Sequence, residues 1–348
     1  MSSSSGSTEV TEFETKTIRI GEGECTILLQ NENGPCPLVA LVNTLILNEV
    51  GAGEAQSSKV SLSSYTSGKD KILVKTLLEL LGEVLVEKST QYGQVEAGKF
   101  NEDVNEVLAL LPKLVTGMNI NVRFNGSFDD TAEMSLFRLY DVDVVHGWIC
   151  DPEDPEYDLI DQVGSYDEAQ STILKDNEES GQNEEMHTKA EAVKHFMQLN
   201  ATQLTTYGLQ FLRDLLSEDS PAVLFRNDHF ATIYKHNGTL YTLVADQGYK
   251  HEKSMVWQSL TSVNGASDAF YTSSFKAPTE DQPTNTDTAA QQTGQHDYDL
   301  ARQLQIDEDA QLAAQLNQPR TQSRNTRQQQ KSTSSKQPKD KKSKCTIM

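Results

Sequence analysis

The chain has 348 residues with 36% hydrophobic content, which is enough for one sizeable core with flexible ends. Its net charge of −21 disfavours nucleic acid as a partner, because a polyanion would be repelled. Its four cysteines form no CxxC pair, which argues against a zinc site and against a disulfide framework, and no other pattern implies a metal or a cofactor.

Residues 1–15 are rich in Ser, Thr and Glu and lack the apolar stretch of a signal peptide, so we expect them to be disordered. A folded domain is expected over residues 16–276, with a first strand at 16–20. No run in the chain approaches the roughly 20 apolar residues of a transmembrane helix. The protein is therefore expected to be intracellular.

The segment around Cys36 has the pattern of a cysteine peptidase active site. Residues 25–30 form a short apolar run that fits a strand, residues 31–35 are rich in turn formers, and the apolar segment after Pro37 fits a buried helix. Cys36 then lies at a helix N-terminus, where backbone N–H groups and the helix dipole favour the thiolate. Gln30 is placed to donate to an oxyanion together with the Cys36 N–H. The alternative is an inert buried thiol.

Helices and strands follow one another in a way that predicts an α+β fold. Apolar spacing predicts helices at residues 72–86, 165–174 and, with interruptions, 189–216. Strand-like runs then occupy residues 222–234 and 239–245, joined by an Asn-Gly turn at 237–238 that is typical of a hairpin. A helical part is thus followed by an antiparallel sheet.

His229 has the most suitable setting for the base that a nucleophilic cysteine needs. It lies within the strand-like runs, and a hairpin turning at Asn237 and Gly238 pairs residues whose numbers add up to about 475. Asp246 then falls opposite His229 and is a candidate to orient its imidazole. The rival base is His146, and an ordinary hydrogen-bonded histidine is the alternative for His229.

Several motifs together resemble the MINDY family of deubiquitinases over about residues 16–276. They are Gln30-Asn31-Glu32-Asn33-Gly34-Pro35-Cys36-Pro37-Leu38, Asn121-Val122-Arg123-Phe124, His146-Gly147-Trp148, Phe225-Arg226-Asn227-Asp228-His229-Phe230 and Asp246-Gln247-Gly248-Tyr249. The resemblance implies a papain-like thiol isopeptidase that is selective for lysine-48-linked polyubiquitin and trims chains from the distal end. It implies Cys36 as nucleophile, His229 as base and Gln30 as oxyanion-hole residue. Asp246 rests on the hairpin register alone.

Composition changes after residue 276. Residues 277–295 are rich in Thr, Gln, Asp and Pro and are expected to form a disordered linker. Residues 296–317 contain Leu-Ala-x-Gln-Leu twice, twelve residues apart, and resemble the MIU type of ubiquitin-interacting helix. The apolar stripe that would bind ubiquitin comprises Leu300, Ala301, Leu304, Leu312, Ala313 and Leu316. The alternative is a solvated or self-associating helix.

The last segment, residues 318–348, is basic and ends in Cys-Thr-Ile-Met. From residue 320 onward, nine basic residues face one acidic residue, so this tail carries +8 and the rest of the chain −29. The ending matches a prenylation motif at Cys345, and the basic stretch supplies a second membrane signal. We expect a cytoplasmic protein that is partly anchored to a cytosolic membrane face. A disordered basic tail is the alternative.

Taken together, these patterns predict a cysteine deubiquitinase with a tethered ubiquitin-binding helix and a lipid-anchored tail. One alternative is a catalytically silent adaptor that binds polyubiquitin through the same helix. Another is a thiol hydrolase that acts on a substrate other than ubiquitin. The Leu-Ala-x-Gln-Leu helix separates this last alternative from the others.

Overall fold

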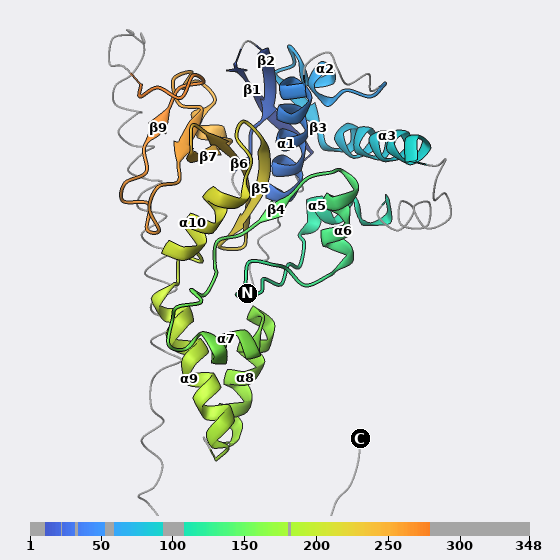
Figure 1. Ribbon diagram of the computed structural model, residues 1–348. Helices are drawn as coiled ribbons and strands as arrows, with labels where there is room; N and C mark the ends of the chain where they lie inside the picture. Colours follow the sequence, from blue (N-terminus) through green and yellow to red (C-terminus); the bar gives the residue numbers. More distant parts are fainter. Residues whose placement is uncertain are drawn as a thin grey trace, which may run out of the picture. The chain divides into compact units, whose positions relative to one another are not determined.

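The computed structural model describes residues 11–21, 23–31, 34–52, 59–92, 108–179 and 182–278. Two sheets and several helices make up this part of the chain (Figure 1), as the α+β prediction expects. None of the described helices is long and apolar enough to cross a membrane.

The smaller sheet has three antiparallel strands in the order β2-β1-β3. They are β1 (Glu12–Ile20), β2 (Gly23–Leu28) and β3 (Lys71–Leu73). Strand β1 begins at Glu12, before the predicted start at residue 16, because Phe13 is only 1% exposed in the core and pairs with Ile72 of β3. Residues 12–15 therefore belong to the folded domain, in place of the disordered segment expected for residues 1–15.

Helix α1 (Cys36–Ala52) is buried on all sides over residues 37–47. It packs against β1 and β2 of the smaller sheet and against β5 and β6 of the larger one. Asn43 ties α1 to the end of β2, since its side chain accepts a hydrogen bond from the Leu28 N–H at 2.8 Å and donates one to the Leu28 carbonyl at 3.0 Å. The long apolar run after Pro37 is thus the central helix that its sequence predicts.

The larger sheet has six strands in the order β4-β5-β6-β7-β8-β9, and only the β4–β5 pair is parallel. Its strands are β4 (Val144–Val145), β5 (Pro221–Arg226), β6 (His229–His236), β7 (Thr239–Leu243), β8 (Trp257–Ser259) and β9 (Phe270–Tyr271). Two-residue turns join β5 to β6 and β6 to β7. In each turn both residues have positive φ, as type I′ hairpins require, and the predicted hairpin at Asn237–Gly238 is confirmed.

The remaining helices lie beside the sheets or, for α7, α8 and α9, below them in the view of Figure 1. They are α2 (Leu62–Thr66), α3 (Val74–Tyr92), α5 (Lys113–Thr116), α6 (Ala132–Leu139), α7 (Tyr157–Val163), α8 (Tyr166–Glu179), α9 (Glu184–Leu199) and α10 (Thr206–Leu215). Helices α7, α8 and α9 pack together as one helical group. The predicted helical stretch 189–216 is two helices, because Asn200 ends α9 and Thr205 caps α10.

Helix α10 lies directly on the backbone of the His146-Gly147-Trp148 motif. A Cβ atom at Gly208 would lie 1.9 Å from the Gly147 carbonyl oxygen, and one at Gly147 would lie 2.3 Å from a methyl carbon of Leu204. Gly208 therefore cannot carry a side chain without moving α10 from this backbone, whereas a side chain at Gly147 would displace the end of the Leu204 side chain. The motif serves this close packing of helix and backbone.

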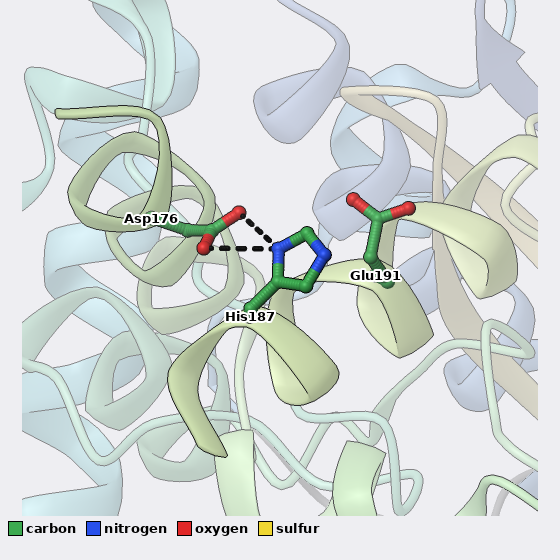
Figure 2. A group of neighbouring side chains, drawn as sticks. All are labelled: Asp176, His187 and Glu191. Carbon is green, nitrogen blue, oxygen red and sulfur yellow. Dashed lines mark hydrogen bonds and ion pairs between the residues drawn. The ribbon is translucent and has the colours of Figure 1, made fainter. Parts of the chain in front are cut away.

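Helices α8 and α9 are joined by a cluster of charged side chains (Figure 2). Asp176 is 4% exposed, and both its oxygens lie 3.1–3.2 Å from Nδ1 of His187, while Glu191 lies one turn further along α9. These three residues have the geometry of a metal site. However, Lys194 Nζ lies 2.8 Å from Glu191 and 3.7 Å from Asp176, so a cation of the protein already balances the two carboxylates.

Candidate active site

The structure brings Cys36 next to His229. Cys36 is the first residue of α1, and its thiol accepts a hydrogen bond from the backbone N–H of Phe230, the residue after His229. Strand β6 continues along the same helix, where the Thr232 hydroxyl donates to the Ala40 carbonyl at 3.2 Å. The end of a buried helix and the start of a strand therefore hold the predicted nucleophile and base together.

His229 is exposed at the start of β6, immediately after the tight turn Asn227–Asp228. The surrounding protein lowers the pKa of its imidazole by desolvation, so the neutral form that can accept a proton is favoured. Within the part of the chain that the structure describes, no hydrogen bond fixes the ring.

The charge state of Cys36 differs from the sequence-based expectation. Burial raises the pKa of its thiol, and the N–H groups of Phe230 and of Cys36 itself lower it by less. The predicted preference for thiolate at the helix N-terminus is therefore wrong, because desolvation outweighs the two N–H groups. At neutral pH both shifts favour the uncharged forms, a thiol at Cys36 and a neutral imidazole at His229.

Gln30 lies between two chain segments. Its N–H donates to the Ala245 carbonyl at 2.6 Å, and its carbonyl accepts the Gln247 N–H at 2.8 Å. Its side-chain Nε2 donates to the Gly34 carbonyl at 3.0 Å, two residues before Cys36. Since a primary amide has two N–H groups, the other remains for an oxyanion beside Cys36.

Asp246 lies beside Gln30 rather than in a strand pair with His229. The pairing of β6 with β7 has the predicted register, for example Ile233 with Thr242, but β7 ends at Leu243. The chain then turns away, so that Asp246 forms a bridge with Gln30 and its carboxylate accepts the Gly248 N–H at 2.6 Å. Asp246 thus caps the short 3-10 helix η2 (Gln247–Tyr249).

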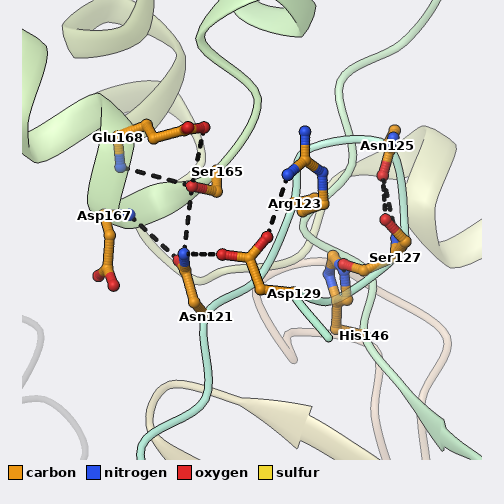
Figure 3. A network of polar contacts seen from close by, with 9 residues as sticks. All are labelled: Asn121, Arg123, Asn125, Ser127, Asp129, His146, Ser165, Asp167 and Glu168. Atoms are coloured by element: carbon orange, nitrogen blue, oxygen red, sulfur yellow. Dashed lines mark hydrogen bonds and ion pairs between the residues drawn. The ribbon is translucent and has the colours of Figure 1, made fainter. Parts of the chain in front are cut away.

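His146, the rival base, has a structural role (Figure 3). It is 1% exposed, and its Nδ1 accepts the Trp148 N–H at 3.2 Å. Its Nε2 faces the carbonyl of Ser127, which lies near it in the figure, at 3.0 Å. Nε2 must then carry the proton, and burial lowers the pKa of the ring to about 4. Both ring nitrogens are in use, so His146 is not available as a base. Trp148 is a core residue, packed against Phe124 and Phe196.

The motif around Asn121 attaches the helical group to the rest of the fold (Figure 3). The Asn121 amide donates to Asp129 and to Ser165 at 2.5 and 3.1 Å, and its oxygen accepts the Asp167 N–H at the start of α8. Arg123 pairs with the same aspartate at 3.0 Å. The motif therefore positions α8 and takes no part in the Cys36–His229 pair.

The cysteines of the described residues form no disulfide. Cys25, Cys36 and Cys150 are free thiols, and Cys25 and Cys150 are buried. The predicted ubiquitin-binding stripe, Leu300, Ala301, Leu304, Leu312, Ala313 and Leu316, and the predicted lipidation site Cys345 lie outside the described residues. Sequence reasoning missed the Phe230 N–H, whose only signal is its position after the base.

Comparison with known proteins links this geometry to a family. The family model described as MINDY deubiquitinase matches residues 11–275. Two relatives are from Saccharomyces cerevisiae: protein YGL082W is 41% identical over 80% of this chain and 72% of its own length, and ubiquitin carboxyl-terminal hydrolase MIY1 is 38% identical over 87% and 83%. Human ubiquitin carboxyl-terminal hydrolase MINDY-2 is 33% identical over 86% of this chain and 46% of its own length.

Proposed function

Because the chain belongs to the MINDY family of deubiquitinases, we propose that it hydrolyses isopeptide bonds in lysine-48-linked polyubiquitin and trims chains from the distal end. Deubiquitinase activity follows from family membership, and the residues below are our assignment of how this chain performs it. The observation that carries the assignment is that the Phe230 N–H acts on the Cys36 thiol, since Phe230 directly follows His229 on β6 and β6 packs against α1.

The reaction begins from the neutral pair. His229 takes the proton of the Cys36 thiol as the sulfur attacks the carbonyl carbon of the isopeptide bond. The tetrahedral intermediate then collapses, and the imidazolium of His229 donates the proton to the departing lysine amine. A thioester between Cys36 and the distal ubiquitin remains, and water activated by His229 hydrolyses it. No cofactor enters these steps.

Charge develops on the carbonyl oxygen during both steps. The Cys36 N–H at the start of α1 and the second N–H of the Gln30 amide are the proposed donors to this oxyanion. Both are held by the main chain, Cys36 by the buried helix and Gln30 by its bonds to Ala245 and Gln247. Such prearranged donors stabilise the intermediate without reorganising as it forms.

The test of this function is cleavage of tetra-ubiquitin of each linkage type by the purified protein. We expect the lysine-48-linked chain to be cleaved at least ~tenfold faster than chains of other linkages. This ratio corresponds to a difference of ~1.4 kcal/mol in transition-state binding between the linkages. Tri-ubiquitin and mono-ubiquitin should appear before di-ubiquitin if trimming starts at a chain end, and a label on the distal ubiquitin should leave in the mono-ubiquitin if that end is the distal one. Equal cleavage of all linkages would contradict the proposed selectivity.

We also propose that residues 296–317 bind ubiquitin and retain long chains near the active site. The support is the repeated Leu-Ala-x-Gln-Leu pattern. In the inactive Cys36→Ala background, Leu304→Ala is expected to weaken binding of tetra-ubiquitin by about tenfold, since hot-spot truncations cost about 1–2 kcal/mol. Gln305→Ala, which lies outside the apolar stripe, is the control. Equal affinities of the two variants, measured by calorimetry, would reject the proposal.

The C-terminal tail is proposed to be prenylated on Cys345 and to bring the enzyme to a cytosolic membrane face. The support is the ending Cys-Thr-Ile-Met with basic residues before it. Protein expressed in cells with a prenylation pathway is expected to carry a farnesyl group that is absent from Cys345→Ser, as intact-protein mass spectrometry will show. An unmodified wild-type C-terminus in those cells would contradict this assignment.

A further inference from the structure

Glu14 is an acidic residue outside the proposed catalytic set. It contacts both the residue that precedes Gln30 in the sequence and the distant segment that pairs with Gln30. The main-chain carbonyl of Glu14, in β1, accepts the Leu29 N–H at 2.8 Å, directly before Gln30. On the other side of Gln30, the Glu14 carboxylate pairs with Lys250 Nζ at 3.2 Å and accepts a hydrogen bond from the Gln247 side chain. Glu14 therefore joins residue 29 to residues 247 and 250.

The segment that Glu14 holds is the same one that fixes the Gln30 backbone. Ala245 and Gln247 bond to the two sides of Gln30, at 2.6 and 2.8 Å. Beyond η2, the segment is held to β1 a second time, because the buried Lys16 Nζ donates to the Met255 carbonyl at 2.6 Å. Strand β1 thus holds the segment at two places, one near Gln30 and one remote from it.

We infer that Glu14 is a positioning residue for the reaction, whose carboxylate keeps residues 245–250 in place so that Gln30 directs its amide at the oxyanion. The inference rests on the oxyanion role proposed for Gln30. Glu14 acts through its contacts with Gln247 and Lys250 and not through a contact with Cys36.

The environment of Glu14 agrees with this role. Its side chain is 26% exposed and that of Lys250 is 22% exposed, so the pair is mostly shielded from water. The hydrogen bonds from Lys250 and then Gln247 lower the pKa of the Glu14 carboxyl, and the group stays ionised at neutral pH. Ion pairs of this kind add little to overall stability. A displacement of an oxyanion donor by a fraction of an ångström, in contrast, directly slows catalysis.

Glu12 provides a matched control on the same strand. It lies two residues before Glu14, so its side chain leaves the same face of β1, and its carboxylate pairs with Lys71 of β3. Lys71 has no bond to the segment that holds Gln30 among the described contacts. Glu12→Ala and Glu14→Ala each remove one ion pair of β1, and only the second removes a contact to residues 247–250.

The experiment measures kcat and KM for lysine-48-linked tetra-ubiquitin, the melting temperature, and the rate of Cys36 alkylation by iodoacetamide, read by peptide mass spectrometry. Glu14→Ala is expected to lower kcat by about tenfold with KM unchanged, a fraction of the loss known for removal of an oxyanion donor. Alkylation of Cys36 forms no oxyanion, so its rate should be unchanged. Glu12→Ala should alter none of these quantities.

Further variants separate positioning from folding. Glu14→Gln keeps an acceptor for the Gln247 side chain, so it should have more than half of the wild-type kcat. Lys250→Met removes the other partner of Glu14 and should lower kcat, as Glu14→Ala does. In a Gln30→Ala background, Glu14→Ala should cause no further loss, because the donor it positions is gone.

The outcomes also separate this inference from the proposed function. Wild-type kcat in Gln30→Ala would overturn the oxyanion role of Gln30 and the positioning role with it. An impaired Gln30→Ala together with full activity in Glu14→Ala, or losses that multiply in the double variant, would overturn only the role of Glu14. A drop in alkylation rate that parallels the drop in kcat would likewise assign Glu14 to general folding of the site.

Discussion

Replacement of Cys36 by alanine is expected to abolish cleavage of polyubiquitin, with kcat reduced on the order of 10⁴-fold or more, as for other enzymes that lose their nucleophile. No other group near His229 in the described structure can form the thioester. The loss should occur without unfolding. Alanine has a high helix propensity, and Cys36 is only partly buried, so its replacement leaves little unfilled space. Gel-based cleavage of lysine-48-linked tetra-ubiquitin and thermal melting measure the two effects.

Cys25→Ala is the control for this variant. Cys25 is a buried thiol in β2, and burial raises its pKa to about 12, so it is unreactive and serves packing alone. Its replacement should retain activity in the folded protein. Binding of tetra-ubiquitin by Cys36→Ala should also be retained, since the proposed ubiquitin-binding helix is untouched. Cleavage by Cys36→Ala at the wild-type rate would assign the nucleophile to another residue.

Local patterns predicted much of this structure, because the features in question depend on neighbouring residues. A turn followed by a long apolar run predicts that a buried helix begins at Cys36, and α1 does begin there. Asn237–Gly238 predicts a type I′ hairpin, and both residues have the positive φ of that turn. These signals need no knowledge of distant parts of the chain.

Features that depend on distant pairing were not predictable in the same way. The strand start at Glu12 is fixed by pairing with Leu73, 61 positions along the chain. Asp246 shares a bridge with Gln30 because the chain turns away after Leu243, and the extrapolated hairpin register contains no signal for that turn. The contacts of Glu14 with Gln247 and Lys250 are equally remote in sequence.

The protonation states of Cys36 and His229 illustrate the same limit. A helix N-terminus lowers a thiol pKa, and the sequence shows that such an end is present. It does not show how deeply the sulfur lies, and in the structure burial raises the pKa of Cys36 above its ordinary value of 9.0. Desolvation by the surrounding protein likewise lowers the pKa of His229 below 6.5, although its side chain is partly open to solvent. Desolvation moves both groups toward their neutral forms, because it penalises charge of either sign.

This neutral pair predicts a particular pH dependence of kcat/KM, which reports the free enzyme. His229 must be neutral to accept the thiol proton, so activity is lost as pH falls through its pKa, which lies below 6.5. The thiol must carry a proton for later delivery to the lysine amine, so activity is lost again as pH rises through the pKa of Cys36, above 9.0. We expect a plateau that extends beyond both of these values.

Substitution of His229 by alanine removes the base and should lower kcat by about 10²–10⁴-fold. The acidic limb of the pH profile should disappear with it, because no other group near Cys36 is proposed to titrate there. His236→Ala, at the opposite end of β6, is the matched control and should keep both activity and profile; its imidazole bonds to Asp219 at 2.7 Å, away from Cys36. An acidic limb that lies above pH 6.5, or that survives in His229→Ala, would reject His229 as the base.

Alkylation of wild-type Cys36 by iodoacetamide should keep accelerating above pH 9, since the resting thiol is neutral until then. Rapid, pH-independent alkylation near neutrality would instead indicate a thiolate–imidazolium pair, and the proton transfer proposed for the first step would already be complete before substrate binds.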